Sequence, residues 1–316
     1  FGSDGFEPWR CDGFQTVKTF DIYSGVGGSV PFGYFEINND LYFFANNGGG
    51  VKLYKFNGDF TFNNSVNNNW SNGLNWNAGI TPLLTEDATI PSGFNINVDA
   101  NAFANNLNVN SPLNLTTGNL NFRGNLSLNA PVTLNANNVN LKGKNAAILN
   151  GNAINYLTTN GAGTVNVENL NPTRGQVNLP IGTATNFNPI TIENTGISDT
   201  FSVNVQDGIS NTTGGAVNAT WNISEAIAGD SNVNVSFTWN QTQENGLFNR
   251  NTAAVGHYYN ATWNSESSSI VTGTNPYTIS ATNISSFSPF GVLNQSALGL
   301  EDNNFVANQI QVYPNP

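Results

Sequence analysis

The sequence predicts an all-β protein, and three observations support this prediction. Short apolar steps with a period of two recur through the centre of the chain, turn residues separate them, and helical periodicity is scarce. Only 9% of the residues are charged, and Met is absent. We expect partial propeller-like repeats, a short β-solenoid, an antiparallel β-sandwich and an extended C-terminal tail, in that order.

The solenoid is predicted from the spacing of six steps. Each step is an apolar–polar–apolar triplet bounded by turn residues: Leu107–Val109, Leu113–Leu115, Leu120–Phe122, Leu126–Leu128, Val132–Leu134 and Val139–Leu141. The first and fourth, second and fifth, and third and sixth steps start 19 residues apart. Three strands per repeat are what a triangular coil needs, and stacked coils bury equivalent side chains. A meander of short hairpins would also alternate, but it has no reason to keep this repeat.

Residues 1–60 are predicted to form incomplete propeller-like repeats. Two aromatic anchors, Trp9 and Tyr54, are 45 residues apart, and so are the hairpin-turn dipeptides at 12–13 and 57–58. A strand pair is expected between them, over residues 34–45. A period near 45 with a few strands per unit fits propeller blades.

Residues 61–170 are assigned to the solenoid and its Trp-rich entry segment. Trp70 and Trp76 allow two interpretations. They could stack on sugar rings, as in a carbohydrate-binding module, or they could cap the open end of the solenoid and hide its apolar rungs. The capping interpretation is the simpler one. Residues 165–170 are expected to form the last rung.

Residues 171–294 are predicted to form the sandwich, because the strands lengthen and aromatic residues return. Trp221, Trp239 and Trp263 fall on three strands and are expected in its core. The expected strands are Ile190–Ile192, Phe201–Val205, Thr220–Ile223, Val233–Trp239, His257–Trp263, Tyr277–Ile279 and Phe287–Val292. Residues 295–311 have no pattern that could bury a core, so a linker is expected there.

Four segments resemble parts of known bacterial surface proteins. Residues 69–98, with Trp70, Trp76 and the Asp87-x-x-Ile90 phrase, resemble an entry segment that leads into a β-helix-like repeat. Glu7–Gly13 resembles the ELWxxDGT repeat, with Pro8 in place of Leu and Phe14 in place of Thr. Residues 179–292, which end in the phrase Ser-Phe-Ser-Pro-Phe, resemble a module found just ahead of secretion signals. The last five residues resemble the start of the type A C-terminal sorting domain of type IX secretion substrates: Val312, Tyr313, Pro314, Asn315 and Pro316.

The resemblance to type IX substrates implies a partner and a location. The sorting domain of such substrates is received by an outer-membrane translocon pore and a shuttle barrel, and the protein reaches the cell surface of a Gram-negative bacterium. In that family a small β-sandwich follows the Tyr-Pro-Asn-Pro phrase. Because Met is absent, we expect the chain to begin after processing or to be a C-terminal piece of a longer protein.

The charge balance and the scarcity of reactive residues argue against several functions. The net charge of −11 and the lack of basic clusters argue against nucleic acid and against an anionic membrane surface. A catalytic triad would have to use His257, the only His, and no Gly-x-Ser-x-Gly elbow is present. Cys11 is the only Cys and is expected to be buried in a blade. We therefore expect no catalytic residues, no metal site and no cofactor.

These observations favour a non-enzymatic, exported cell-surface protein, a stalk or adhesin-like scaffold that is secreted through the type IX system. Two alternatives stay open. The chain could be a carbohydrate-binding module that uses Trp70 and Trp76 on a polysaccharide, or it could be the accessory C-terminal part of a larger secreted hydrolase.

Overall fold

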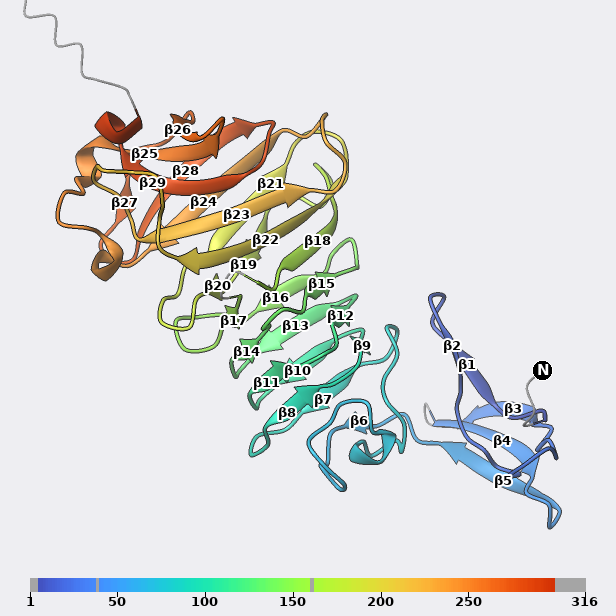
Figure 1. The fold of residues 1–316 in the computed structure, drawn as a ribbon. Coiled ribbons are helices and arrows are strands. Elements are labelled where there is room, and N and C mark those ends of the chain that lie inside the picture. The colour runs from blue at the N-terminus through green and yellow to red at the C-terminus, as the bar shows by residue number, and fades with distance from the viewer. Residues whose placement is uncertain (1–4, 38–39, 160–161, 299–316) are drawn as a thin grey trace, which may run out of the picture.

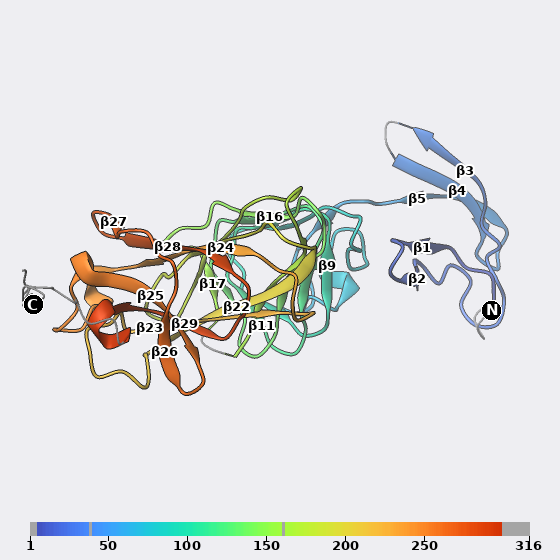
Figure 2. The same cartoon turned by 90° about the horizontal axis from the view of Figure 1, so that it is seen from above.

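The computed structural model describes residues 5–37, 40–159 and 162–298, and this part of the chain is all-β. It contains no α-helix, only strands and four short 3-10 turns. The molecule is elongated, with a small N-terminal unit at one end, a stack of short strands in the middle and a layered sheet structure at the other end (Figures 1 and 2). The predicted fold class is confirmed.

The central stack is a triangular solenoid with three parallel sheets. Its register confirms the 19-residue repeat, since Leu107 lies beside Leu126, Leu113 beside Val132, and Leu120 beside Val139. The strands of the first sheet are β6 (Phe60–Thr61), β7 (Ala88–Ile90), β10 (Leu107–Val109), β13 (Asn125–Leu128) and β16 (Ala147–Leu149). Those of the second are β8 (Ile96–Val98), β11 (Leu113–Leu115), β14 (Val132–Thr133), β17 (Leu157–Thr158) and β20 (Ile181–Gly182). The third begins with β9 (Ala102–Ala104), β12 (Leu120–Phe122), β15 (Val139–Leu141) and β18 (Val165–Leu170).

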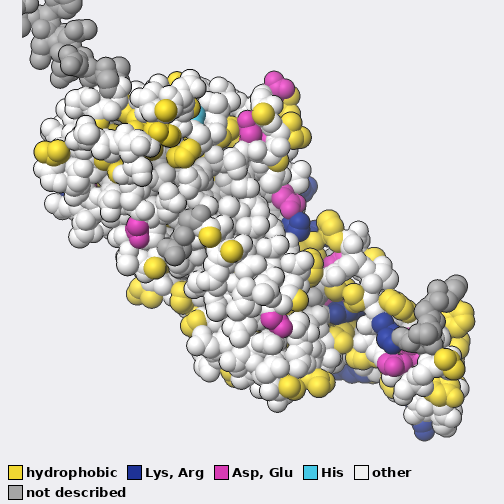
Figure 3. Space-filling view, viewed as in Figure 1, with side chains coloured by type: hydrophobic (Ala, Val, Ile, Leu, Met, Phe, Trp, Pro, Cys, Tyr) yellow, Lys and Arg dark blue, Asp and Glu magenta, His cyan; other side chains and the backbone are white. Residues whose placement is uncertain are grey.

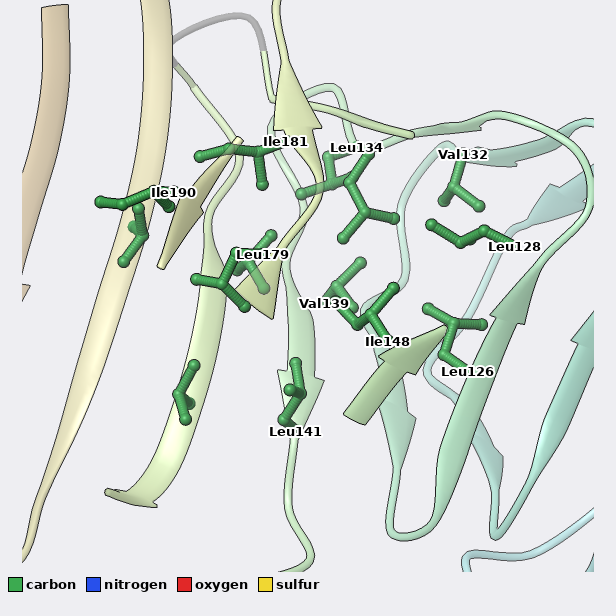
Figure 4. Packing of buried hydrophobic residues seen from close by; sticks show 14 of the residues in the cluster. Leu126, Leu128, Val132, Leu134, Val139, Leu141, Ile148, Leu179, Ile181 and Ile190 are labelled. Atoms are coloured by element: carbon green, nitrogen blue, oxygen red, sulfur yellow. The ribbon is translucent and has the colours of Figure 1, made fainter. Parts of the chain in front are cut away.

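The solenoid interior is apolar because every apolar step sends its two outer residues inward. Leu126, Leu128, Val139 and Leu141 are fully buried, and Figure 4 shows their side chains converging between the three sheets. Each polar middle residue points outward. A three-residue strand is enough here, since each inward side chain also packs on its equivalents in the neighbouring coils.

The solenoid and the sandwich share a sheet. The backbone hydrogen bonds of this sheet continue across the boundary predicted at residue 171. Val165 of β18 pairs in parallel with Val139 of β15 and antiparallel with Val203 of β22 (Asp199–Asp207). The strand is therefore both the expected last rung and the first sandwich strand. A nine-stranded sheet results, and one apolar cluster extends from Phe60 in the first coil to Val292 in the sandwich.

The sandwich consists of two antiparallel layers. One continues the nine-stranded sheet beyond β22 with β23 (Ala219–Glu225), β29 (Pro289–Asn294), β25 (Ala253–Tyr259) and β26 (Thr262–Ser265). The other contains β19 (Val177–Leu179), β21 (Ile190–Asn194), β24 (Val233–Trp239), β28 (Tyr277–Ile284) and β27 (Thr272–Gly273). Trp221 and Trp239 are fully buried and Trp263 is 5% exposed, so all three are core residues as expected.

Two local predictions in the sandwich are wrong. Residues 257–263 form a hairpin rather than one strand, because Asn260 and Ala261 both have positive φ, as a two-residue type I′ turn requires. The predicted linker also begins too early. Gln295–Leu298 forms a 3-10 turn, η4, and Leu298 is buried against Trp263 and Leu293.

The N-terminal unit is a hairpin beside a three-stranded sheet. The hairpin is β1 (Trp9–Cys11) with β2 (Thr16–Lys18), and the sheet is β3 (Phe32–Ile37), β4 (Asp40–Asn46) and β5 (Val51–Phe56). The expected turn at 12–13 is confirmed, with Gly13 at a φ of 87°. The expected hairpin turn at 57–58 is wrong, since β5 leads into β6, which pairs in parallel with β7.

Candidate functional site

The two Trp residues singled out in the sequence lie under the first coil. Each side chain is 1% exposed, and the rings pack edge to face with their centroids 4.7 Å apart. The Trp76 indole Nε1 donates to the Trp70 carbonyl oxygen at 3.0 Å. Phe62 packs edge-on against Trp76. Neither Trp offers an open ring face to a sugar, and the geometry places them as the cap of the stack.

A buried amide holds the loop that carries this cap. Asn75 is fully buried, and its side-chain oxygen accepts from the backbone N–H groups of Val66 and Asn67 at 3.0 and 3.1 Å. Its amide nitrogen donates to the Asn69 carbonyl at 2.8 Å. A buried amide with all its hydrogen bonds formed specifies one loop conformation, which fixes the position of Trp70.

Residues of the Glu7–Gly13 motif stabilise the N-terminal unit. Glu7 is 5% exposed, and its carboxylate accepts from the Ser29 hydroxyl at 2.7 Å and from the Ser29 and Ile22 backbone N–H groups, both at 3.0 Å. It therefore ties the 22–29 loop to the hairpin. The prediction that Cys11 is buried is wrong, since its side chain is exposed. Trp9 is also 56% exposed, so it does not anchor a blade core.

Arg10 and Asp12 fasten the hairpin to the solenoid. The Arg10 guanidinium lies 2.5 Å from the Glu86 carboxylate and donates to the Thr81 carbonyl. Asp12, 7% exposed, accepts from the Leu84 backbone N–H at 3.0 Å. Burial raises the pKa of Asp12, but backbone N–H donors from its own turn and from Leu84 outweigh burial and hold that pKa below its ordinary value. The contact therefore depends on an ionised Asp12.

A recess of about 370 Å³ lies between this hairpin and the first coil. We call it the junction recess. Ile80 and Phe103 contribute apolar surface from the solenoid side, where the buried Trp70 also borders the recess, and Gln15, Val17 and Lys18 line it from the hairpin. Hydrophobic and basic side chains gather where the N-terminal unit meets the solenoid (Figure 3). Ligand sites commonly occur at such junctions between structural units.

One residue on the solenoid side of this recess interrupts a row of identical residues in the sequence repeat. In the third sheet the outward position is occupied by Asn121, Asn140 and Asn166 in successive coils. Phe103 occupies the equivalent position one coil earlier. An aromatic residue in a row of asparagines is a local break in the repeat, and it lies where the hairpin contacts the solenoid.

The N-terminal sheet has an apolar face open to solvent. This face consists of Phe32, Phe35, Ile37, Tyr42, Phe44, Val51 and Leu53. Its outer side chains are half exposed, from 50% for Phe32 to 56% for Val51. Phe35 and Tyr42 stack with centroids 5.7 Å apart and an interplanar angle of 14°. An apolar face of this kind, open to solvent, is typical of a surface that contacts another protein.

His257 is buried in the sandwich and forms no catalytic triad with the described residues. It is 1% exposed, its ring stacks on Phe290 at 4.4 Å, and its Nδ1 lies 3.0 Å from the Glu266 carboxylate. A triad needs a nucleophile at Nε2, but Nε2 is buried without a hydrogen-bond partner in the described part of the chain.

The remaining predicted site residues fall elsewhere. The sorting phrase, Val312, Tyr313, Pro314, Asn315 and Pro316, lies outside the described residues. Within the described ranges, no three His, Cys, Asp or Glu side chains cluster so as to hold a metal ion. No helix in those ranges has the length and apolar character needed to cross a membrane.

The fold and these contacts define an all-β chain that combines a capped parallel solenoid with an antiparallel sandwich. No protein-family model matches the sequence. Neither a curated protein nor a solved structure matches it.

Proposed function

We propose that this chain is a non-enzymatic scaffold of an exported cell-surface protein, a rigid stalk that holds its N-terminal unit away from its C-terminal end. The proposal takes its structural support from the continuous apolar cluster between Phe60 and Val292. A stalk must resist bending, and a hydrogen-bonded sheet that crosses from solenoid to sandwich has no linker at which to bend.

Two contacts reinforce the junction between solenoid and sandwich. The buried Thr159 hydroxyl, directly after β17, donates to the Val205 carbonyl at 2.9 Å and accepts from the Val205 N–H at 3.0 Å. The Arg174 guanidinium donates to the carbonyls of Glu168 and Ala146. These contacts join the last coil to the first sandwich strands, which supports a rigid connection.

Distance measurements between spin labels test the stalk. With Cys11 replaced by Ser, Cys residues at the exposed positions Ser92 in the first coil and Ser267 in the sandwich accept labels. We expect a single narrow distance distribution, as narrow as that of the control pair Ser210 and Ser267 within the sandwich. A broad or two-peaked distribution for the long pair alone would reveal a hinge and overturn the stalk.

Export through the type IX system is the second part of the proposal, and it is supported by the C-terminal resemblance alone. In a bacterium with this system, the protein truncated after Leu298, which keeps the buried end of η4, should stay inside the outer membrane, whereas the uncut protein should reach the surface. Protease accessibility on intact cells measures this. Equal surface exposure of both forms would remove the sorting role of the tail and leave the stalk untouched.

A further inference from the structure

The three sheets of the solenoid end differently on the side of the N-terminal unit. In the first sheet β6 covers β7, and the Thr89 carbonyl accepts from the Phe62 N–H at 2.9 Å. In the second sheet the Asn97 N–H donates to the Asn68 carbonyl at 2.8 Å, and the Asn97 carbonyl accepts from the Trp70 N–H at 2.9 Å. In the third sheet β9 is the last strand, and no segment of the described residues pairs with its outer edge. The first coil therefore lacks one strand.

The register of β9 shows which backbone groups this leaves unpaired. The Ala102 N–H donates to the Asn119 carbonyl at 2.8 Å, and the Ala104 carbonyl accepts from the Arg123 N–H at 3.2 Å, both toward β12. Consecutive residues of a parallel strand direct their backbone groups to opposite sides. The N–H and carbonyl of Phe103 therefore face the outer edge, where no described strand meets them. An uncovered edge of this kind is a template for another strand.

The junction recess lies at this edge. The chain leaves the first coil at Ser71, whose N–H and hydroxyl donate to the Asp99 carboxylate at 3.0 and 2.6 Å. Ser71 lines the recess together with Phe103, so the recess lies where the chain would have to continue to cover β9. Its volume of about 370 Å³ is within the range of ligand pockets. The recess therefore takes the place of the missing strand.

The side chains around the edge define what a covering strand must carry. Phe103 points outward and is half-buried, so a residue opposite it gains most by being apolar or aromatic. Ala102 and Ala104 point inward and are smaller than every other inward residue of the third sheet. Because the buried Trp70 already lies under the first coil, the residues beside these two alanines must also be small.

The recess does not require a charged ligand. Its two basic side chains, Arg10 and Lys18, lie in ion pairs with Glu86 and Asp21. The unpaired groups are those of the Phe103 backbone, one donor and one acceptor, and an extended peptide offers the complementary pair. Main-chain hydrogen bonds supply affinity when a peptide adds to a sheet edge, and alternate side chains supply specificity.

We propose that the junction recess binds an extended peptide segment of a partner protein, which adds to β9 as a parallel strand. The segment places an apolar or aromatic residue against Phe103 and a small residue on each side of it. It continues the contact that each coil already makes with the next. This inference adds a partner to the proposed stalk, and it depends neither on the rigidity of the stalk nor on the route of export.

Amide hydrogen exchange of the whole chain tests the open edge. In the free protein the Phe103 N–H should exchange at least a hundredfold faster than that of Asn97, which has a covering segment. The probe is a capped, uncharged peptide with the sequence of residues 100–106, Ala-Asn-Ala-Phe-Ala-Asn-Asn. Saturating peptide should slow exchange at Phe103 at least tenfold and leave Asn97 unchanged. Equal protection of the two amides in the free protein, or no slowing by millimolar peptide, would overturn the proposal.

Methylated peptides test the strand geometry. At Asn97 the covering segment contributes the carbonyl of the residue before, and the N–H of the residue after, the one that lies opposite. Methylating the N–H of the Ala that follows the peptide's Phe removes the donor to the Phe103 carbonyl, so calorimetry should show binding at least tenfold weaker. Methylating the N–H of the Phe itself is the matched control, because that N–H faces away from β9, and it should change binding little. Equal affinities of the two methylated peptides would contradict strand addition.

A substitution locates the peptide on the protein. Phe103→Asn extends the asparagine row by one coil, so it should preserve the solenoid while weakening binding at least fivefold through the lost side-chain contact. Phe14→Asn, on the hairpin but outside the recess, is the control and should bind as the wild type does. Binding by Phe103→Asn as tight as that of the control would place the peptide elsewhere and refute the assignment. If Phe103→Asn unfolds the chain, the methylated peptides decide.

Discussion

The solenoid and the N-terminal sheet use apolar residues in opposite ways. Leu120, on a three-residue strand of the solenoid, is fully buried, whereas Leu53, on a six-residue strand of the N-terminal sheet, is 54% exposed. Strand length therefore does not decide burial here. In the solenoid each coil covers the next, so repetition buries every inward side chain. The N-terminal sheet is a single layer that packs only one of its faces.

The contrast is tested most strongly by replacing one Leu with Ala in each region and comparing the free energies of unfolding. Leu120→Ala should reduce the free energy of unfolding by about 2–5 kcal/mol, because the cavity would lie between two other coils that cannot collapse into it. Leu53→Ala should change it by less than about 0.5 kcal/mol, because the side chain is already half in water. Urea unfolding followed by circular dichroism measures both.

A large effect of Leu53→Ala would change the comparison. It would mean that the open apolar face is covered in solution. Repeating the unfolding at several protein concentrations, with sedimentation to measure mass, would then separate self-association from an internal contact. An effect below about 1 kcal/mol for Leu120→Ala would show that the coils relax around a void, contrary to the stacked interior described above.

The junction between solenoid and sandwich gives the next largest effect. Thr159→Val keeps the shape of the side chain but removes the hydroxyl that pairs with both backbone groups of Val205. Two buried backbone groups lose their partner, so we expect a loss of about 1–3 kcal/mol in the free energy of unfolding. The neighbouring Thr158→Val, at a half-buried outward position, is the control and should change little. If Thr159→Val changed the free energy of unfolding as little as Thr158→Val, water would have to replace the Thr159 hydroxyl as the partner of Val205.

The sequence predicted the parts of the fold that repeat. The spacing of the six apolar steps is enough to assign the register of Leu107 on Leu126 and of Leu120 on Val139, because repetition ties each strand to its partner at a fixed distance. The turn at residues 12–13 was predictable from the local preference of Asp-Gly, whereas at Asn57-Gly58 the parallel pairing of β6 with β7 overrides the same kind of preference.

The features that depend on long-range contacts were not predictable. The hairpin at Asn260 and Ala261 lacks the Gly that usually marks such a turn, and pairing of β25 with β29 imposes its conformation. The junction recess brings Lys18 and Phe103, 85 positions apart in the sequence, to one lining, and no local pattern specifies how the hairpin docks. Only the interruption of the asparagine row by Phe103 hints at the contact.

The smallest expected effect is the pH dependence of the contact between the N-terminal hairpin and the solenoid. The pKa of Asp12 is lower in the folded protein than its ordinary value of 3.8, so its carboxylate stabilises the contact above that value. The stabilisation should be lost as the pH falls through the folded pKa, below about 4. The Leu84 N–H donates directly to Asp12, so its hydrogen-exchange protection reports the contact. We expect Asp12→Asn to reduce this protection at neutral pH by about 1 kcal/mol and to flatten its dependence on acid.

Comparing the wild type with Asp12→Asn separates the contribution of Asp12 from that of Glu86, the other carboxylate at this contact, because Glu86 is present in both proteins. Asp21→Asn removes a nearby carboxylate from the same unit and should leave the protection of Leu84 unchanged. If wild-type protection stayed constant down to pH 2, the hairpin would be held by Arg10 and apolar packing alone. The N-terminal unit would then be as firmly attached as the coils of the solenoid are to one another, and the contrast between the two regions would be confined to the exposed apolar face.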